Sequence, residues 1–166
     1  MRTLARALVV ALALAQAGCG FKLRGQQEFP FDSLYVPPNN PLTIELARFV
    51  AAGSNAKVVT VPQDAQARFN LLGEAQEKVI LALNTQGRVR EYQLRYRVVF
   101  SVAGDKGFNY IPQSEIILTR DITFNDQVLA KENEEALLYR DMRSDMVQQI
   151  MRRLAASRPP AVEPDE

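Results

Sequence analysis

Alternation of apolar and polar residues is clearest in the middle of the chain. Residues 92–102 carry an apolar side chain at every second position, from Tyr92 to Val102. The positions between them include Gln93, Arg95 and Arg97. A period of two over this length is typical of a half-buried antiparallel strand. We therefore predict a strand with one face in the core and one polar face.

Four further stretches are predicted to be strands. Residues 33–36 and 58–61 form two short stretches rich in apolar residues. A proline, which cannot donate a hydrogen bond to a sheet, follows each of them. Residues 69–83 and 116–124 alternate over longer spans. In the last of these, Arg120 occupies the apolar phase. Either the register slips there, or the guanidinium group meets a partner.

The stretch 69–83 is predicted to bend near Gly73 or Ala75 and otherwise to keep a single phase. Asn70 and Glu74 then lie on its polar face. Glycine-containing turns follow at 84–87 and 103–107. The residues predicted on its apolar face are Phe69, Leu71, Gly73, Ala75, Val79, Leu81 and Leu83.

A helix is predicted over residues 41–52. Asn40 is a good N-cap, and Pro41 suits the first helical position because its missing amide would be unpaired there anyway. Gly53 is expected to end the helix in a left-handed conformation. Apolar residues recur at helical spacing at Leu42, Leu46, Phe49 and Val50.

A second, longer helix is predicted from about residue 130. Its acidic residues gather near the start and its arginines near the end, which complements the helix dipole. The span suggests about 25 residues, or about 37 Å. We interpret its methionines as core residues rather than as a groove for a partner. The apolar stripe consists of Leu138, Met142, Met146, Ile150 and Leu154.

This order of elements predicts an α+β fold. Two helices and a run of strands cannot alternate as parallel crossovers, so both helices are expected to pack on one face of a mostly antiparallel sheet, as a two-layer sandwich. The other face, with Arg95, Arg97 and Thr119, is then either solvated or covered by a partner.

The N-terminus has the pattern of a secretory signal. Arg2 and Arg6 precede about a dozen mainly apolar residues, too few to span a membrane. The run ends in small residues before Cys19, the only cysteine. This ending resembles a bacterial lipobox, with S-diacylglycerol and N-acyl modification of Cys19, although Gln16 departs from the usual aliphatic residue. A plain signal-peptidase site or a free thiol are the alternatives.

We therefore expect a lipoprotein signal peptide at 1–18, one α+β domain at 19–156 and a disordered tail at 157–166. Without the signal peptide, the chain has 18 basic and 19 acidic residues. Its net charge is therefore close to zero and gives no electrostatic reason to expect nucleic-acid binding. A lipidated Cys19 leaves no cysteine for a disulfide. The chain has no histidine, the commonest general base and a usual metal ligand.

Neither an enzymatic activity nor a metal or other cofactor is expected. A carboxylate-based hydrolase would need two Asp or Glu groups converging in a cleft. The acidic candidates instead gather at the start of the second helix, at Glu132, Glu134 and Glu135, and on a polar strand face, at Glu115 and Asp121.

Several segments, in order and spacing, resemble the LptE (also RlpB) family of lipopolysaccharide-assembly lipoproteins. The similarity covers residues 19–155. The segments that carry it are Cys19-Gly-Phe-Lys-Leu-Arg-Gly25, Glu91-Tyr-Gln-Leu94, Val128-Leu-Ala-Lys-Glu-Asn-Glu134, Asp141-Met-Arg-Ser-Asp-Met146 and Ile150-Met-Arg-Arg-Leu154.

The resemblance implies two helices on a four-stranded sheet and a lipid anchor on the periplasmic side of the outer membrane. It also implies that the protein plugs the β-barrel LptD, helps it to fold and binds lipopolysaccharide. Lys131 matches a family position associated with lipopolysaccharide binding. Arg88 and Arg90 lie near a second basic position, but out of register. An accessory lipoprotein of another outer-membrane assembly machine remains the alternative.

Overall fold

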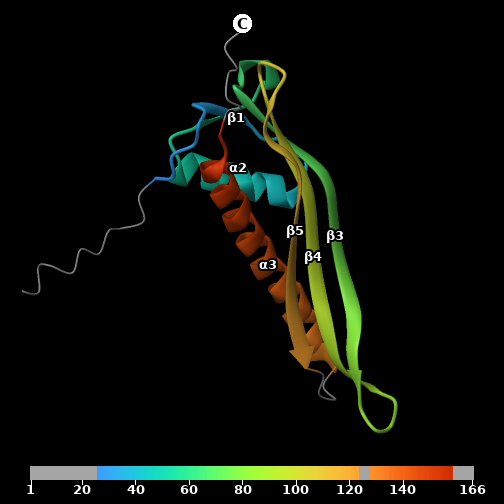
Figure 1. Cartoon of the computed structure of the whole chain (residues 1–166). Helices are drawn as coiled ribbons and strands as arrows, with labels where there is room; N and C mark the ends of the chain where they lie inside the picture. Colours follow the sequence, from blue (N-terminus) through green and yellow to red (C-terminus); the bar gives the residue numbers. More distant parts are fainter. Residues whose placement is uncertain (1–25, 124–127, 159–166) are drawn as a thin grey trace, which may run out of the picture.

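The computed structural model describes residues 26–123 and 128–158, and for residues 128–133 the backbone alone. Figure 1 shows a long, twisted sheet with both helices of this part of the chain on the same side of it. The α+β prediction is therefore confirmed. The elements in chain order are β1 (Ser33–Tyr35), α2 (Pro41–Gly53), β2 (Lys57–Val59), the 3₁₀ turn η1 (Pro62–Asp64), β3 (Ala67–Leu83), β4 (Val89–Gly104), β5 (Asn109–Thr123) and α3 (Val128–Ala156).

The sheet has five strands in the order β2-β1-β3-β4-β5, so the predicted four-stranded sheet was wrong. It is mixed, because β1 runs parallel to both β2 and β3, but most of its paired residues are antiparallel, as predicted. The pairing of β1 with β2 follows from their connection through α2, since a crossover helix joins parallel neighbours. The three long strands β3, β4 and β5 form two antiparallel pairs.

The segment that leads into β1 is fixed from Gln27 onward. The Gln27 amide donates to the Gly53 carbonyl at 2.7 Å, and the Asn55 amide donates to the Gln27 carbonyl at 3.3 Å. Phe29 and Phe31 are buried in the core. These hydrogen bonds attach the chain to the end of α2 at Gln27, which is eight positions after Cys19 in the sequence.

Helix α2 begins as predicted and ends differently. The Asn40 side chain accepts a hydrogen bond from the Leu42 amide at 2.7 Å, which confirms the N-cap. Gly53 has no positive φ, so the predicted left-handed terminus was wrong. The helix ends at Gly53 and is capped by Ser54, whose backbone is extended. Its amide and its hydroxyl both donate to the Val50 carbonyl, which satisfies one of the last helical acceptors.

Strand β3 changes phase at a β-bulge between Leu71 and Gly73. Before the bulge, Phe69 and Leu71 lie opposite core residues of β4, as predicted. After it, Glu74 lies opposite Val98, on the face that carries the helices. A slip of one residue reverses the face of the side chains that follow, here up to the next register shift, between Ile80 and Ala82. The single phase predicted for residues 69–83 was therefore wrong, and Gln76, Lys78 and Ile80 follow Glu74 onto the helix side.

Helix α3 crosses the three long strands diagonally (Figure 1). Met142, Met146 and Met151 are buried, which confirms their assignment to the core. The helix has 29 residues and begins at Val128, so no acidic residue lies in its first turn. The expected dipole contribution of the glutamates is correspondingly small, because it falls off within one turn.

The two ends of α3 protect the two edges of the long strands. In the described part of the chain, β1 pairs with β3 only at Ala67 and Arg68, so most of β3 is an edge, and β5 is the opposite edge. Tyr139 donates from its hydroxyl to the Glu77 carbonyl on β3 at 2.8 Å. Arg153 donates to the Glu115 carbonyl on β5 at 3.0 Å. Occupied edge carbonyls discourage pairing with foreign strands.

Arg120 on β5 has the partner that its position in the apolar phase suggested. Its guanidinium group donates to the Asp145 carboxylate on α3 at 2.7 Å. The register between β4 and β5 continues unbroken through this residue. Of the two possibilities raised by the sequence, the structure therefore shows the paired guanidinium.

We expect Met146→Ala to lower the free energy of unfolding by about 2–5 kcal/mol, because it leaves a cavity in a fully buried site. Ile117→Ala is the control: Ile117 is 53% exposed on the open sheet face, and we expect a change below about 0.5 kcal/mol. Urea denaturation followed by circular dichroism measures both. Equal losses in the two variants would contradict the assignment of α3 to the core.

Candidate functional site

The β3–β4 hairpin carries two of the predicted binding residues. The Asn84 carboxamide oxygen accepts hydrogen bonds from the Gln86 and Arg88 amides at 3.0 and 2.9 Å. The Asn84 amide in turn donates to the Arg88 carbonyl at 2.8 Å, and Gly87 supplies a positive φ of 75°. These bonds fix the turn, and Arg88 and Arg90 project from it as exposed side chains.

Lys131, the third predicted residue, lies in the first turn of α3, and its side chain is outside the described part. Its backbone is four residues before Glu135, which amounts to about 6 Å along the helix. Glu135 pairs with Lys78 at 2.5 Å, and Lys78 lies opposite Leu94. Arg90 is four residues beyond Leu94, or about 13 Å along β4. Lys131 and both arginines therefore belong to the same end of the molecule (Figure 1).

A groove of about 660 Å³ lies between β3 and the first half of α3. It exists because the β-bulge turns polar residues of β3, among them Gln76 and Lys78, toward the first half of α3. Lys78 bridges to Glu135 across it, and the Lys78 ammonium lies 4.5 Å from the centre of the Tyr92 ring. The lining residues are Gln76, Lys78, Glu135, Ala136, Tyr139, Arg140 and Arg143.

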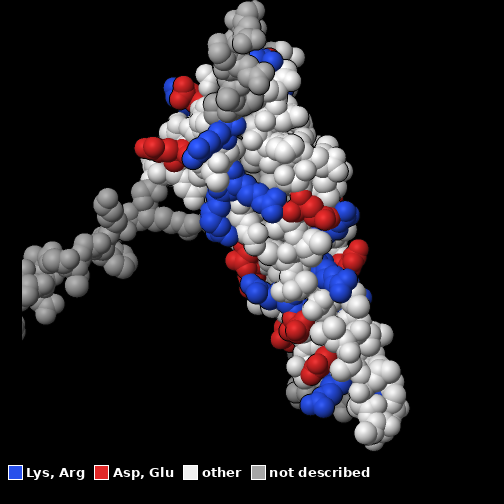
Figure 2. All heavy atoms as spheres, in the orientation of Figure 1, with Lys and Arg blue, Asp and Glu red and all other residues white. Residues whose placement is uncertain are grey.

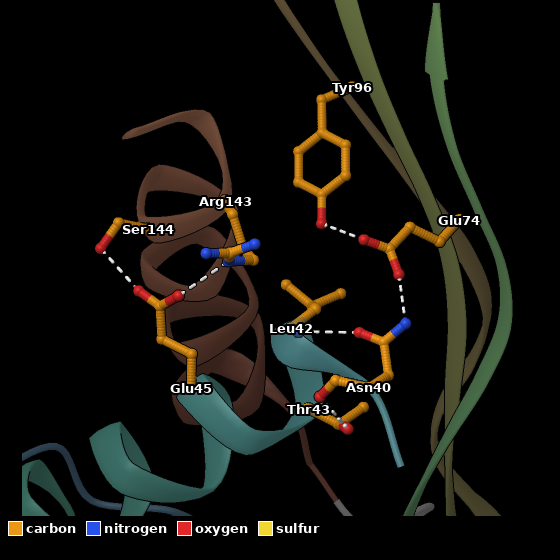
Figure 3. Close-up of polar contacts among 8 residues, drawn as sticks. All are labelled: Asn40, Leu42, Thr43, Glu45, Glu74, Tyr96, Arg143 and Ser144. Carbon is orange, nitrogen blue, oxygen red and sulfur yellow. Dashed lines mark hydrogen bonds and ion pairs between the residues drawn. The ribbon is translucent and has the colours of Figure 1, made fainter. Parts of the chain in front are cut away.

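A chain of hydrogen bonds at the inner end of this groove joins the sheet to α2 (Figure 3). The Tyr96 hydroxyl donates to one oxygen of Glu74 at 2.5 Å, and the Asn40 amide group donates to the other at 2.6 Å. Burial, followed by the hydrogen bond to Glu74, raises the pKa of Tyr96 well above its usual value. The tyrosine thus stays protonated and acts as a donor.

A second contact in Figure 3 joins the two helices. Glu45 on α2 accepts hydrogen bonds from Arg143 at 3.1 Å and from the Ser144 hydroxyl at 2.8 Å. Both groups of contacts depend on residues far apart in the sequence. Glu74 was predicted to face away from the helices, because the alternation of residues gives no sign of the bulge. Sequence reasoning therefore missed the groove and this network.

The open face of the sheet carries Arg95, Arg97 and Thr119, which are exposed, as their alternation predicted. Arg97 pairs with Glu115 across β4 and β5, and Arg95 donates to Gln93 at 3.0 Å. In Figure 2 a group of basic side chains lies together in the upper middle of the visible surface, and below it basic and acidic side chains are interspersed. Cys19, the predicted lipidation site, lies outside the described residues.

Comparison with known proteins identifies the family. A model of the lipopolysaccharide-assembly family LptE matches residues 31–154. The chain belongs to the LptE family. An LPS-assembly lipoprotein LptE from Photorhabdus laumondii is 29% identical over 156 residues, which cover 89% of this chain and 83% of the relative. The LptE of Yersinia enterocolitica is 30% identical, with coverages of 90% and 75%.

Solved structures agree with this membership. The solution NMR structure of an uncharacterized lipoprotein B from Nitrosomonas europaea is 40% identical, with a TM-score of 0.70 and coverage of 82% of this chain and 91% of that one. The crystal structure of the rare lipoprotein B from Shewanella oneidensis is 26% identical, with a TM-score of 0.64 and coverages of 75% and 92%. The resemblance to LptE inferred from the sequence is thus confirmed. None of the helices in the described ranges is long and apolar enough to cross a membrane.

We expect Tyr96→Phe to lower the free energy of unfolding at pH 7 by about 1–2 kcal/mol, because a hydrogen bond to a charged acceptor is lost. The folded state holds the Tyr96 proton more tightly than the unfolded chain does, where the hydroxyl titrates near pH 10.0. Its stabilising contribution is therefore complete below pH 10 and is lost as the pH rises above it. The stability difference between wild type and variant should shrink from about pH 10 upward.

Urea denaturation between pH 7 and about pH 11 measures this difference. Tyr35→Phe, on β1, is the control because it removes a hydroxyl outside the network. If the difference in free energy of unfolding between wild type and Tyr96→Phe stays constant over the whole pH range, the raised pKa of Tyr96 is contradicted.

Proposed function

We propose that this protein is a lipid-anchored, non-enzymatic subunit that assembles lipopolysaccharide into the outer leaflet of the outer membrane. The observation that carries the proposal is the family match over residues 31–154. The proteins named LptE in Photorhabdus and Yersinia, which are similar over most of their length, support it further. The fold contributes a rigid support, in which a hairpin with two arginines extends beyond the helices (Figure 1).

The proposed anchor is Cys19, acylated on its sulfur and on its new amino group. Two chains on the sulfur and one on the amine give stable membrane attachment. Eight Cα-to-Cα steps separate Cys19 from Gln27, the first of the described residues with hydrogen bonds to the domain. Fully extended, they reach about 29 Å. The end of the domain that contains β1 and α2 would then stay close to the periplasmic face of the outer membrane.

The proposed partner is the β-barrel LptD, which this protein would plug and help to fold. A polar barrel lumen calls for a plug with a mixed polar surface rather than a large apolar patch. The open sheet face, with Arg95, Arg97 and Thr119, has that character, and α3 protects both strand edges on the other side.

Purification of the lipoprotein from detergent-solubilised membranes tests this partnership. We expect a very large β-barrel subunit to co-purify in a near-equimolar amount, and mass spectrometry to find Cys19 acylated. Recovery of a different barrel would instead favour an accessory role in another assembly machine. Recovery of no barrel would contradict the proposal.

The proposed contact with lipopolysaccharide is made by Lys131, Arg88 and Arg90. Arginine and lysine suit phosphate because they combine positive charge with several hydrogen-bond donors. The two arginines are exposed on a turn that four hydrogen bonds around Asn84 hold in place, so little ordering is required on binding. In this mechanism the protein binds the phosphates of the lipid A portion and performs no covalent chemistry.

We expect the combined variant Lys131→Glu, Arg88→Glu, Arg90→Glu to bind purified lipopolysaccharide at least tenfold more weakly, because three attractive charges become repulsive. The control variant Arg48→Glu, Lys57→Glu, Lys106→Glu changes the net charge equally at exposed positions in α2, β2 and the β4–β5 turn. These positions lie toward the other end of the molecule (Figure 1).

Binding is measured by surface plasmon resonance, and folding by circular dichroism and thermal unfolding. The control variant should keep wild-type affinity. Equal affinities of the two variants, at unchanged stability, would contradict the assignment of these three residues.

A further inference from the structure

The β3–β4 hairpin has an unusual charge pattern for this chain. Between Glu77 and Glu91 there is no acidic residue, whereas Lys78, Arg88 and Arg90 are basic. The mature chain as a whole carries nearly equal numbers of the two signs. The hairpin is therefore a locally cationic segment on an otherwise balanced protein.

The same hairpin exposes aliphatic side chains. Ile80, Leu81 and Leu83 are 54%, 45% and 57% exposed, although they lie within four residues of one strand. Single exposed apolar residues are ordinary, but a group of them marks a binding surface. In Figure 2 the tip of the hairpin, at the lower right, shows almost no charged side chains on the visible face.

The apolar and the basic residues lie on neighbouring strands. Leu83 pairs with Val89, which stands between Arg88 and Arg90 in the sequence. Paired strands are about 4.8 Å apart, so the aliphatic group on β3 lies next to Arg90 on β4 and to Arg88 in the turn before it. The Asn84 hydrogen bonds fix this arrangement in the absence of a ligand.

The β4–β5 hairpin at the other end provides a contrast. Its turn contains one acid and one base, Asp105 and Lys106. The Asp105 amide donates to the Gln66 carbonyl at 3.0 Å, and the Phe108 ring packs closely over Gly104. This turn is thus neutral and fastened to the domain, whereas the β3–β4 turn is cationic and extends beyond it (Figure 1).

We propose that the hairpin of residues 79–90 binds one anionic amphiphile through both of its parts. Arg88 and Arg90 take phosphate groups, and Ile80, Leu81 and Leu83 take the acyl chains joined to them. This inference depends on the proposed function, because it takes the amphiphile to be lipopolysaccharide. It adds an acyl-chain contact on β3 to the charge contact.

A lipid fits this surface better than a protein partner does. Buried centres of protein interfaces are enriched in aromatic residues, methionine and arginine; residues 79–90 contain two arginines but no aromatic residue and no methionine. Aliphatic side chains next to arginines instead match acyl chains next to phosphates. Burial of three such side chains makes a contribution to affinity comparable with that of the charges.

The first experiment measures binding of purified lipopolysaccharide to the variant Ile80→Ser, Leu81→Ser, Leu83→Ser. We expect affinity to fall at least tenfold. The control variant Leu72→Ser, Ile117→Ser, Val61→Ser removes three aliphatic side chains of similar exposure, 53%, 53% and 45%, away from the hairpin, and should bind normally. Circular dichroism checks that both variants are folded.

The second experiment identifies the occupant in intact cells. The photoreactive residue p-benzoylphenylalanine is placed at Leu83, or at Ile117 as control, in the full lipoprotein. After irradiation we expect a lipopolysaccharide adduct, detected by antibody, at Leu83 and none at Ile117. A protein adduct, a phospholipid adduct or no adduct at Leu83 would overturn the inference.

The two proposals fail in different ways. If the acidic variant of Lys131, Arg88 and Arg90 binds weakly but the serine variant of the hairpin binds normally, the acyl-chain contact is wrong and the charge contact stands. If neither variant loses affinity, the lipopolysaccharide-binding function assigned to this end of the protein is itself wrong.

Discussion

The β-bulge between Leu71 and Gly73 determines which side chains of β3 face the helices. Because side chains alternate along a strand, one extra residue moves Glu74, Gln76 and Lys78 from the open face to the helix face. In the described part of the chain, the buried residues of α3 therefore lie in its second half, from Met142 onward, whereas its first half borders the polar groove. An added Cβ at Gly73 would meet Val99 at an ordinary 3.8 Å, so space alone does not require glycine here.

The two halves of α3 are consequently held by interactions of different strength. Met142, Met146 and Ile150 are buried, and each such contact is worth about 1.5–3 kcal/mol. The Lys78–Glu135 pair is about one third exposed, and pairs of this kind contribute about 0–1 kcal/mol. The first turns of α3, with Lys131, lie at the same end of the molecule as the Arg88 and Arg90 hairpin, which extends beyond the domain.

The opposite end is the more firmly fixed. There Phe29 and Phe31 enter the core, β1 and β2 complete the sheet, and Glu74 connects Tyr96 with the cap of α2. A short segment leads from this end to Cys19. The proposed lipid anchor at Cys19 and the exposed cationic hairpin would then lie toward opposite ends of the long strands. Edge protection by Tyr139 and Arg153 also keeps the strands from pairing with those of other proteins.

The sequence by itself determined the helices, all five strand segments, the Asn40 cap, the buried methionines and the membership in the LptE family. These features depend on local periodicity, on capping chemistry and on the order of short segments, which a chain carries before it folds. Tertiary structure alone decided the parallel pairing of β1 with β2 and β3, the phase of β3 beyond the bulge, and the capping of α2 by Ser54. It also created the groove and brought Tyr139, Arg153 and Glu74 to their partners. The reason is physical: pairing partners and bulges depend on contacts between residues far apart in the chain, and a polar residue such as Glu74 is equally compatible with either face until the opposite strand and the helix are in place.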